Sequence, residues 1–297
     1  MKLKELTTES RNRDTENLDT MTALELVTAM NREDAVVPRA IERVLPEIAK
    51  AVDLIAERLA KGGRLIYVGS GTSGRIGALD ASECPPTFNT NPEMVQFLIA
   101  GGESALTRSS EGSEDSEEMG RSDIAMRDLG DCDVVVGLAA SGRTPYTIGA
   151  LQYAGSKGSA TIAVACNHDS ALGKAANIQI EVEVGPEALT GSSRLKAGTA
   201  QKLICNMLTT GAMARMGYVY SNLMVNLHLT NKKLLERGIA ILESLTNLNR
   251  DAALQLLESA DMSVPVALVM LKANASKSES LERLRKAKGN VRKAIEG

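Results

Sequence analysis

The stretch YVGSGTSGRIGAL, from Tyr67 to Leu79, runs from an apolar segment into a corner rich in glycine and hydroxyl side chains. A second corner of the same kind, LAASGRTPYTIGAL, extends from Leu138 to Leu151. Both corners contain Ser-Gly-Arg, and in both the segment IGAL follows where a helix would run. The repetition predicts two similar strand-to-helix turns in one sheet.

Apolar runs of strand length alternate with helical patterns in the middle of the chain. These runs occupy residues 64–68, 94–100, 133–139, 160–166 and 177–184. The first, third and fourth are almost continuously apolar, as parallel strands covered on both faces are. The alternation predicts an α/β fold with three layers (αβα) and a five-stranded, mainly parallel sheet.

The segments on either side of this region differ in character. The start of the chain, to about Asp19, is too polar to pack alone, and the pattern from Thr22 to Glu25 predicts a capping box that opens a short helix. A helical stretch from Ile41 to Leu59 follows, in which Pro46 is expected to produce a kink. After about Leu245 only short helical patterns remain. We therefore expect an N-terminal arm with helices (1–54), the sheet domain (55–218), a connecting helix (219–245) and a small helical domain (246–297).

Composition excludes several classes of function. The formal net charge is -3 and aromatic residues make up 2%, with no tryptophan, which argues against nucleic-acid binding. The chain start has no apolar signal segment, and no run approaches the ~18 apolar residues of a membrane span. The four cysteines are far apart and form no CxxC pair, and the two histidines lie far from each other. We expect a cytoplasmic protein without a metal site.

The two corners suit an anion. In an open parallel sheet ligands bind beyond the carboxyl ends of the strands, where helix N-termini favour negative charge. Hydroxyl groups can add to a phosphate site there, and the candidates are Ser70, Thr72, Ser73, Ser141 and Thr144. One corner alone would be as well explained by a tight turn, and the G-x-G-x-x-G within it would suggest a dinucleotide site only weakly.

A third segment, TGSSRLKAGTAQK (190–202), supports the phosphate interpretation. It places Ser192 and Ser193 at an expected helix N-cap, with Lys196 in the next turn. Serines at such positions usually only cap the helix. The nearby lysine suggests a role in binding as well.

The residues resemble a known family. The sheet region looks like a sugar isomerase (SIS) domain, and the whole chain is similar to the N-acetylmuramic acid 6-phosphate etherases over nearly its full length. The resemblance rests on the strings LTTESRN, RLIYVGSGTSGRIGALDASECPPTF, LIAGGE, EGSEDS, VVVGLAASGRTPY and TGSSRLKAGTAQKLICNML. Several of these strings are long and unusual, so the resemblance is specific.

The resemblance implies a role for each corner. In such proteins the hydroxyls of both corners bind one sugar phosphate, which matches Ser73, Ser141 and Thr144 in this sequence. Ser192 and Ser193 match a third sugar-contacting loop. Arg75 and Arg143 occupy equivalent places in the two corners and either touch the ligand or brace the loops.

The activity implied is a lyase reaction that removes D-lactate from C3 of the sugar. It needs one group to take the C2 proton and one to protonate the ether oxygen, and two carboxylates can do both. No metal and no redox cofactor is expected. The resemblance selects Glu83 and Glu114 as the two carboxylates, without deciding which is the acid.

Both carboxylates also have a simpler interpretation. Glu83 precedes a double proline expected to end its helix, and partial burial near Cys84 and Phe88 is expected to suit it to proton transfer. Glu114 lies in the run EGSEDSEE, in which a solvated helix face is the usual interpretation. Glu111, three residues earlier on the same expected helix face, is the reserve candidate.

Three alternatives remain open from the sequence. A non-catalytic SIS regulator would share the corners without needing both Glu83 and Glu114. An aldose–ketose isomerase would need no acid at C3, and an NAD-dependent enzyme would rest on the weak glycine motif alone. The resemblance further implies a homodimer, binding of a small sugar phosphate, and a C-terminal fold similar to ubiquitin-associated (UBA) domains. From composition and hydropathy we expect no nucleic-acid or membrane partner.

Overall fold

The structure is a computed structural model that describes residues 6–108, 112–229 and 231–297. The chain divides into two compact units. The first comprises Met1–Ser82 and Pro92–Thr209, and the second comprises Glu83–Asn91 and Thr210–Gly297. The first unit contains the sheet.

The sheet has five strands in the order β2-β1-β3-β4-β5. All neighbouring strands pair in parallel. The bounds are β1 (Leu65–Gly69), β2 (Val95–Ile99), β3 (Val134–Ala139), β4 (Ala160–Ala165) and β5 (Ile178–Glu181). The expected five-stranded parallel sheet is therefore confirmed, with strand ends shifted by a few residues.

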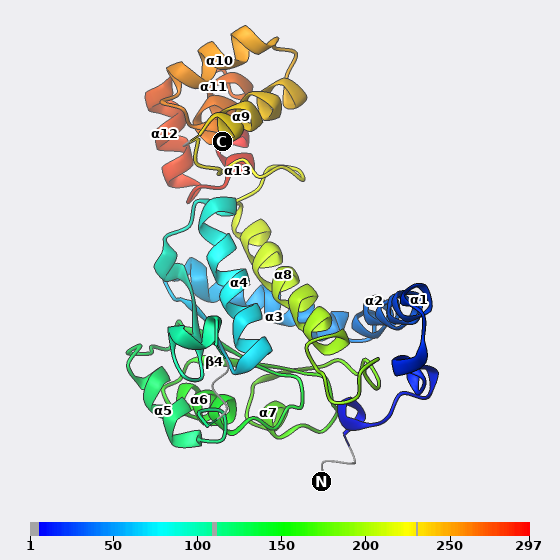
Figure 1. The fold of residues 1–297 in the computed structure, drawn as a ribbon. Coiled ribbons are helices and arrows are strands. Elements are labelled where there is room, and N and C mark those ends of the chain that lie inside the picture. Colours follow the sequence, from blue (N-terminus) through cyan, green and yellow to red (C-terminus); the bar gives the residue numbers. More distant parts are fainter. Residues whose placement is uncertain (1–5, 109–111, 230) are drawn as a thin grey trace. The chain divides into compact units, whose positions relative to one another are not determined.

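Helices cover both faces of this sheet (Figure 1). Ile66 and Val68 of β1 belong to a buried cluster with residues of α5 (Glu117–Ala125), α6 (Pro145–Ser156) and α7 (Ala171–Lys174). Tyr67 points to the opposite face, where its hydroxyl donates to Asp80 of α4 (Gly71–Phe88) at 2.8 Å. Asn206 of α8 (Lys196–Met216) donates to the same carboxylate at 2.6 Å. The alternation along β1 thus builds the three expected layers.

Helices α5 and α6 approach each other closely because each places a glycine at the crossing. A Cβ at Gly120 of α5 would lie 1.9 Å from the Tyr146 carbonyl oxygen of α6. A Cβ at Gly149 of α6 would lie 2.2 Å from the Glu117 carbonyl oxygen of α5. Only glycine fits at these two positions, because the obstructing atoms belong to the backbone.

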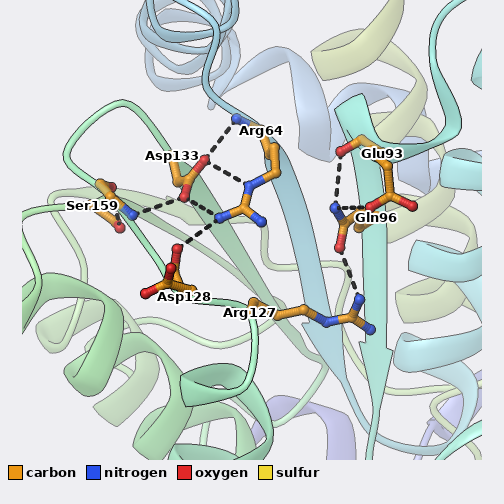
Figure 2. Close-up of polar contacts among 8 residues, drawn as sticks. Arg64, Glu93, Gln96, Arg127, Asp128, Asp133 and Ser159 are labelled. Carbon is orange, nitrogen blue, oxygen red and sulfur yellow. Dashed lines mark hydrogen bonds and ion pairs between the residues drawn. The ribbon is translucent and has the colours of Figure 1, made fainter.

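The beginnings of the strands are joined by a polar network (Figure 2). Arg64 precedes β1, and its guanidinium donates to the Asp133 carboxylate before β3 at 2.6 Å. Asp133 also accepts the backbone N–H groups of Arg64 and Gly130. Burial acts to raise the pKa of Asp133, but the bond from Arg64 and the backbone donors outweigh it, so the pKa lies below its ordinary value. This network lies at the end of the sheet opposite the two corners.

The N-terminal region confirms one expectation and corrects another. Three short 3-10 turns (Thr7–Glu9, Arg13–Thr15, Leu18–Thr20) lead to α1 (Ala23–Asp34), α2 (Val36–Glu42) and α3 (Leu45–Ala60). The capping box of Thr22 and Glu25 opens α1 as predicted. Pro46 does not kink a helix. It lies in the first turn of α3, where a proline costs no hydrogen bond because the N–H groups there have no helical partner.

The double proline does not end its helix as expected. Helix α4 continues through Pro85 and Pro86 to Phe88. Because the pair lies within the last turn, only the carbonyls of Ala81 and Ser82 lose an N–H donor, and Asn89 N–H still donates to the Pro85 carbonyl at 2.8 Å.

The second unit is helical and has its own core. Its helices are α9 (Lys232–Leu245), α10 (Arg250–Ser259), α11 (Val264–Lys272), α12 (Lys277–Lys286) and α13 (Val291–Glu296). Leu242, Leu257 and Leu268 are fully buried in one cluster. The likeness to a UBA fold stays a prediction.

In the described parts of the chain no single helix is long and apolar enough to cross a membrane, whereas α10 and α11 together pass that test as a bent pair, by length and composition only.

Candidate active site

The two corners meet because their strands are neighbours. β1 pairs with β3, and Gly69 at the end of β1 is the register partner of Leu138 near the end of β3. The chain leaves β1 toward β2 on one side and leaves β3 toward β4 and β5 on the other. The strand order therefore reverses between β1 and β3, and ligands of open parallel sheets bind at such a reversal.

The first corner supplies three hydroxyls. Ser70 and Thr72 are half-buried, whereas Ser73 in the first turn of α4 is only 8% exposed. The Ser73 hydroxyl donates to Gln201 Oε1 of α8 at 2.9 Å. Because Ser73 is held by a side chain of another helix, its position is fixed more firmly than that of a free loop serine.

Arg75 braces a loop. Its Nε donates to the carbonyls of Ala105 and Leu106 at 3.1 and 3.0 Å, and its Nη2 donates to the Arg108 carbonyl at 3.0 Å. These carbonyls belong to the segment that follows β2 and leads toward Glu114. Arg75 therefore braces this loop, as one of the two interpretations from the sequence expects.

The second corner turns sharply at Gly142, which has a φ of 68°. A Cβ there would lie 2.4 Å from the Ser170 Cβ. Ser141 is half-buried and accepts the Arg143 backbone N–H at 3.2 Å. Thr144 is the N-cap of α6, yet its side chain makes no capping hydrogen bond. Thr144 therefore holds a hydroxyl at a helix N-terminus that the helix itself does not use.

The third segment approaches the first corner through α8. Gly198 N–H donates to the Ser193 carbonyl at 3.0 Å, and a Cβ at Gly198 would lie 3.6 Å from Thr72 Cγ2. Ser192 and Ser193 are half-buried, but neither is the N-cap, because α8 begins at Lys196. This corrects the sequence expectation for the helix start.

A buried carboxylate takes the capping role instead. Glu187 is fully buried and accepts the N–H groups of Lys196 and Ala197 at 2.9 Å each. Burial raises the pKa of this carboxyl, while the two backbone donors and the Lys196 charge oppose the rise. A charged side chain from nine residues upstream therefore satisfies the first two N–H groups of α8.

Lys196 is turned toward α1. It is 2% exposed, and its Nζ lies 2.5 Å from the Glu33 carboxylate. The positive charge expected to meet a phosphate is thus paired within the protein. Its direct contact with a ligand stays a prediction, and the geometry shows that it fixes the start of α8 to α1.

The two candidate carboxylates lie in different units. Glu114 is exposed, and its carbonyl accepts the Tyr146 N–H in the first turn of α6 at 3.0 Å. Glu114 precedes α5 and does not lie on it, so the prediction that Glu114 lies on a helix face is wrong. Glu83 lies on α4 and is exposed, so the partial burial expected for it is not found. Glu111 lies outside the described residues.

Comparisons with known proteins now identify the family. The model of the SIS domain matches residues 104–211, and that of the glucokinase regulatory protein N-terminal SIS domain matches residues 47–155. An N-acetylmuramic acid 6-phosphate etherase from Clostridium beijerinckii is 51% identical over 100% of this chain and 97% of its own. One from Oenococcus oeni is 54% identical over 99% of each chain. The chain belongs to the N-acetylmuramic acid 6-phosphate etherase family.

A solved structure supports the fold of this etherase-family chain. It is a Bacteroides fragilis protein assigned as a phosphosugar isomerase involved in capsule formation. It is 20% identical and has a TM-score of 0.53, covering 70% of this chain and 98% of its own. At that identity the likeness concerns the fold alone.

Sequence reasoning missed how the N-terminal arm is used in this member of the etherase family. Asn167, two residues after the end of β4, accepts the N–H and hydroxyl of Thr7 at 2.9 Å each. Its amide donates to the Thr8 hydroxyl and to the Ala140 carbonyl, at 3.2 Å each. Ala140 precedes Ser141. All four hydrogen bonds of one buried amide therefore connect the arm to the second corner.

The arm also holds the third segment. Thr15 donates to the Ala188 carbonyl at 2.9 Å, and Asn12 donates to the Pro186 carbonyl at 3.3 Å. Both side chains are buried although the arm is polar. The signal in the sequence was the string LTTESRN, which carried the resemblance without an assigned role.

No metal site is indicated among the described residues, where no three or more His, Cys, Asp or Glu side chains gather suitably for an ion.

Proposed function

We propose that this protein cleaves the C3 D-lactyl ether of N-acetylmuramic acid 6-phosphate, giving N-acetylglucosamine 6-phosphate and D-lactate. The observation that carries the proposal is the full-length membership of the etherase family. The meeting of two hydroxyl-bearing corners at the β1/β3 reversal supports a sugar-phosphate substrate.

The chemistry proceeds by elimination and then hydration. Opening of the sugar ring places C2 beside an aldehyde, which makes the C2 proton acidic enough to remove. Loss of that proton and of the C3–O bond forms a C2–C3 double bond and releases lactate. Water then adds its hydroxyl to C3 and a proton to C2. The sum is hydrolysis of one ether, with no net change of oxidation state.

The proposed binding groups are the hydroxyls of the three segments. Ser73, Ser141 and Thr144 would hold the phosphate together with backbone N–H groups of the α4 and α6 N-termini. The Thr144 hydroxyl makes no capping hydrogen bond to α6, which supports this assignment. Ser70, Thr72, Ser192 and Ser193 would contact the sugar or the remaining phosphate oxygens.

The proposed acid–base pair is Glu83 and Glu114. One takes the C2 proton and the other protonates the departing ether oxygen, which is otherwise a poor leaving group. Glu114 lies beside the second corner through its bond to Tyr146, which supports a place near the substrate. Lys196, paired with Glu33, is assigned to holding the third segment rather than to the chemistry.

The remaining proposals concern the setting. The family resemblance suggests a cytoplasmic homodimer, and the four segments 1–54, 55–218, 219–245 and 246–297 stay our proposed domain division. The α8 residues Ile204, Cys205 and Leu208 are fully buried within one chain, so they belong to the core. A dimer contact would use other residues.

The test is direct. Purified protein is incubated with N-acetylmuramic acid 6-phosphate in the presence of a chelator and without nucleotides, and D-lactate is measured enzymatically. We expect one lactate for each N-acetylglucosamine 6-phosphate formed. Binding of the substrate without lactate release would contradict the proposal and favour a sensing role.

A further inference from the structure

Ser73 uses its proton inside the protein. Its hydroxyl donates to Gln201 Oε1 at 2.9 Å. A serine hydroxyl has one proton to donate and two lone pairs that accept. A phosphate ester oxygen is an acceptor and needs donors around it. In this arrangement Ser73 can accept a further bond but has no proton left for a phosphate.

The other end of the Gln201 amide lacks a partner. Gln201 is 1% exposed, and its Nε2 makes no hydrogen bond to any described residue. A buried amide N–H without an acceptor costs free energy, and such groups are rare in folded proteins. The unpaired N–H group therefore belongs to the residue that holds the proposed phosphate ligand Ser73.

One rotation pairs Gln201 Nε2 with Ser73 and frees the Ser73 proton, and it leaves Oε1 in the position that has no partner among the described residues. Turning the Gln201 amide by 180° about its last bond exchanges Oε1 and Nε2 without changing the shape of the side chain. Such terminal torsions are broad and roughly two-fold, so both orientations are accessible. Nε2 would then donate to the Ser73 oxygen, and the Ser73 proton would be free to donate to the ligand.

We propose that Gln201 is a positioning residue that sets the direction of the Ser73 proton and turns its amide when a phosphate ester binds in the first corner. The inference rests on the proposed function, because it takes Ser73 as a phosphate ligand. Gln201 itself touches no substrate. It acts by presenting either an acceptor or a donor to the Ser73 hydroxyl. Because Gln201 lies on α8, this exchange couples phosphate binding to that helix.

Two substitutions separate this role from packing. Gln201→Glu keeps the shape but offers only acceptors when ionised, so it holds the Ser73 proton permanently. Gln201→Met keeps most of the volume and leaves the Ser73 proton free. We expect Gln201→Glu to weaken phosphate binding strongly and Gln201→Met to weaken it only about three-fold, since just the orienting donor is lost.

A double-substitution cycle distinguishes the hydrogen-bond role from simple charge repulsion. The Kd of N-acetylglucosamine 6-phosphate is measured by calorimetry at pH 8 for wild type, Ser73→Ala, Gln201→Glu and the double variant. Ser73→Ala and Gln201→Glu should each raise Kd by about 10- to 100-fold, as a lost bond to a charged group does. In the double variant the second change should add less than about three-fold.

Gln152→Glu is the matched control, because Gln152 is exposed on α6 and accepts a hydrogen bond from Arg121. It should leave Kd unchanged.

Equal and independent losses of affinity from Ser73→Ala and Gln201→Glu would overturn the proposal, as would unchanged binding in either single variant. A 30-fold loss of affinity in Gln201→Met that is also seen when Ser73 is replaced by alanine would overturn the proposal too. This comparison decides the question if Gln201→Glu fails to fold. Because Kd is read without turnover, a wild type that binds but releases no lactate would refute only the proposed function.

Discussion

The Glu114 carbonyl accepts the Tyr146 backbone N–H at 3.0 Å, which fixes the backbone of Glu114 to the first turn of α6, two residues beyond Thr144. Glu114 therefore belongs structurally to the second corner, although 30 residues separate it from Thr144 in the chain. The bond uses only the backbone and leaves the carboxylate free for other contacts.

Substitution of either proposed acid–base residue should stop turnover but preserve binding. We expect Glu83→Gln and Glu114→Gln each to lower kcat by at least about 100-fold, in the range that general acid–base groups contribute. Glutamine keeps the shape but neither takes nor gives the proton. Lactate release and the Kd of the substrate are measured in parallel. Glu118→Gln, exposed in the same acidic run, is the control and should be fully active. Wild-type turnover in either variant would remove that residue from the mechanism.

The arm should control the third segment. In Thr15→Val the Ala188 carbonyl loses its buried donor, so the loop with Ser192 and Ser193 should shift. We expect KM to rise by about ten-fold with little change in kcat, because binding groups move by a fraction of an ångström. Thr15→Ser should restore KM.

The control for the arm is Thr20→Val, since Thr20 is exposed and its hydroxyl donates to the nearby Asn17 carbonyl. Its KM should match that of the wild type. Equal KM values for Thr15→Val and Thr15→Ser would show that the hydrogen bond does not position the loop.

The α5–α6 crossing should tolerate no side chain at its glycines. Gly149→Ala places a methyl group against the Glu117 carbonyl, and overpacking of this kind costs about 1–3 kcal/mol. Gly155 lies on the same helix, where a Cβ would meet nothing closer than 4.0 Å. Gly155→Ala should therefore stabilise the protein by up to about 1 kcal/mol through helix propensity. Melting temperatures of the two variants should move in opposite directions, and a parallel shift would contradict the packing argument.

The Arg64–Asp133 pair predicts a pH-dependent contribution to stability. The folded pKa of Asp133 lies below its unfolded value of about 3.9, so its contribution is present above that pH and disappears as the pH falls through the folded pKa. Asp133→Asn should cost about 2 kcal/mol at pH 7, as lost bonds to charged groups do. The difference in the free energy of unfolding between Asp133→Asn and wild type, measured by urea denaturation, should become smaller below pH 4. A difference of equal size at pH 3 and pH 7 would contradict the prediction.

The sheet was predictable because its signal is local and repeated. Buried parallel strands give continuous apolar runs, and β1, β3 and β4 show them. Their order was not stated from the sequence, since pairing depends on contacts between distant segments. The two corners could be found because glycine and hydroxyl residues follow each strand directly.

The errors arose where distant groups decide the local structure. Helix α8 starts at Lys196 because Glu187 satisfies its first N–H groups, which no cap pattern at Ser192 or Ser193 reveals. The polar arm is buried because Asn167 and two loop carbonyls supply its partners from some 160 to 175 residues away. Such partners become visible only in three dimensions.

The most direct test of the central claim follows the C2 proton. The protein is incubated with N-acetylmuramic acid 6-phosphate in heavy water, and D-lactate and the deuterium at C2 of the sugar product are measured by NMR. Elimination followed by hydration predicts one lactate per turnover and deuterium at C2 of the N-acetylglucosamine 6-phosphate formed. Lactate released with the original C2 proton fully retained would contradict the elimination route and point to direct displacement at the ether.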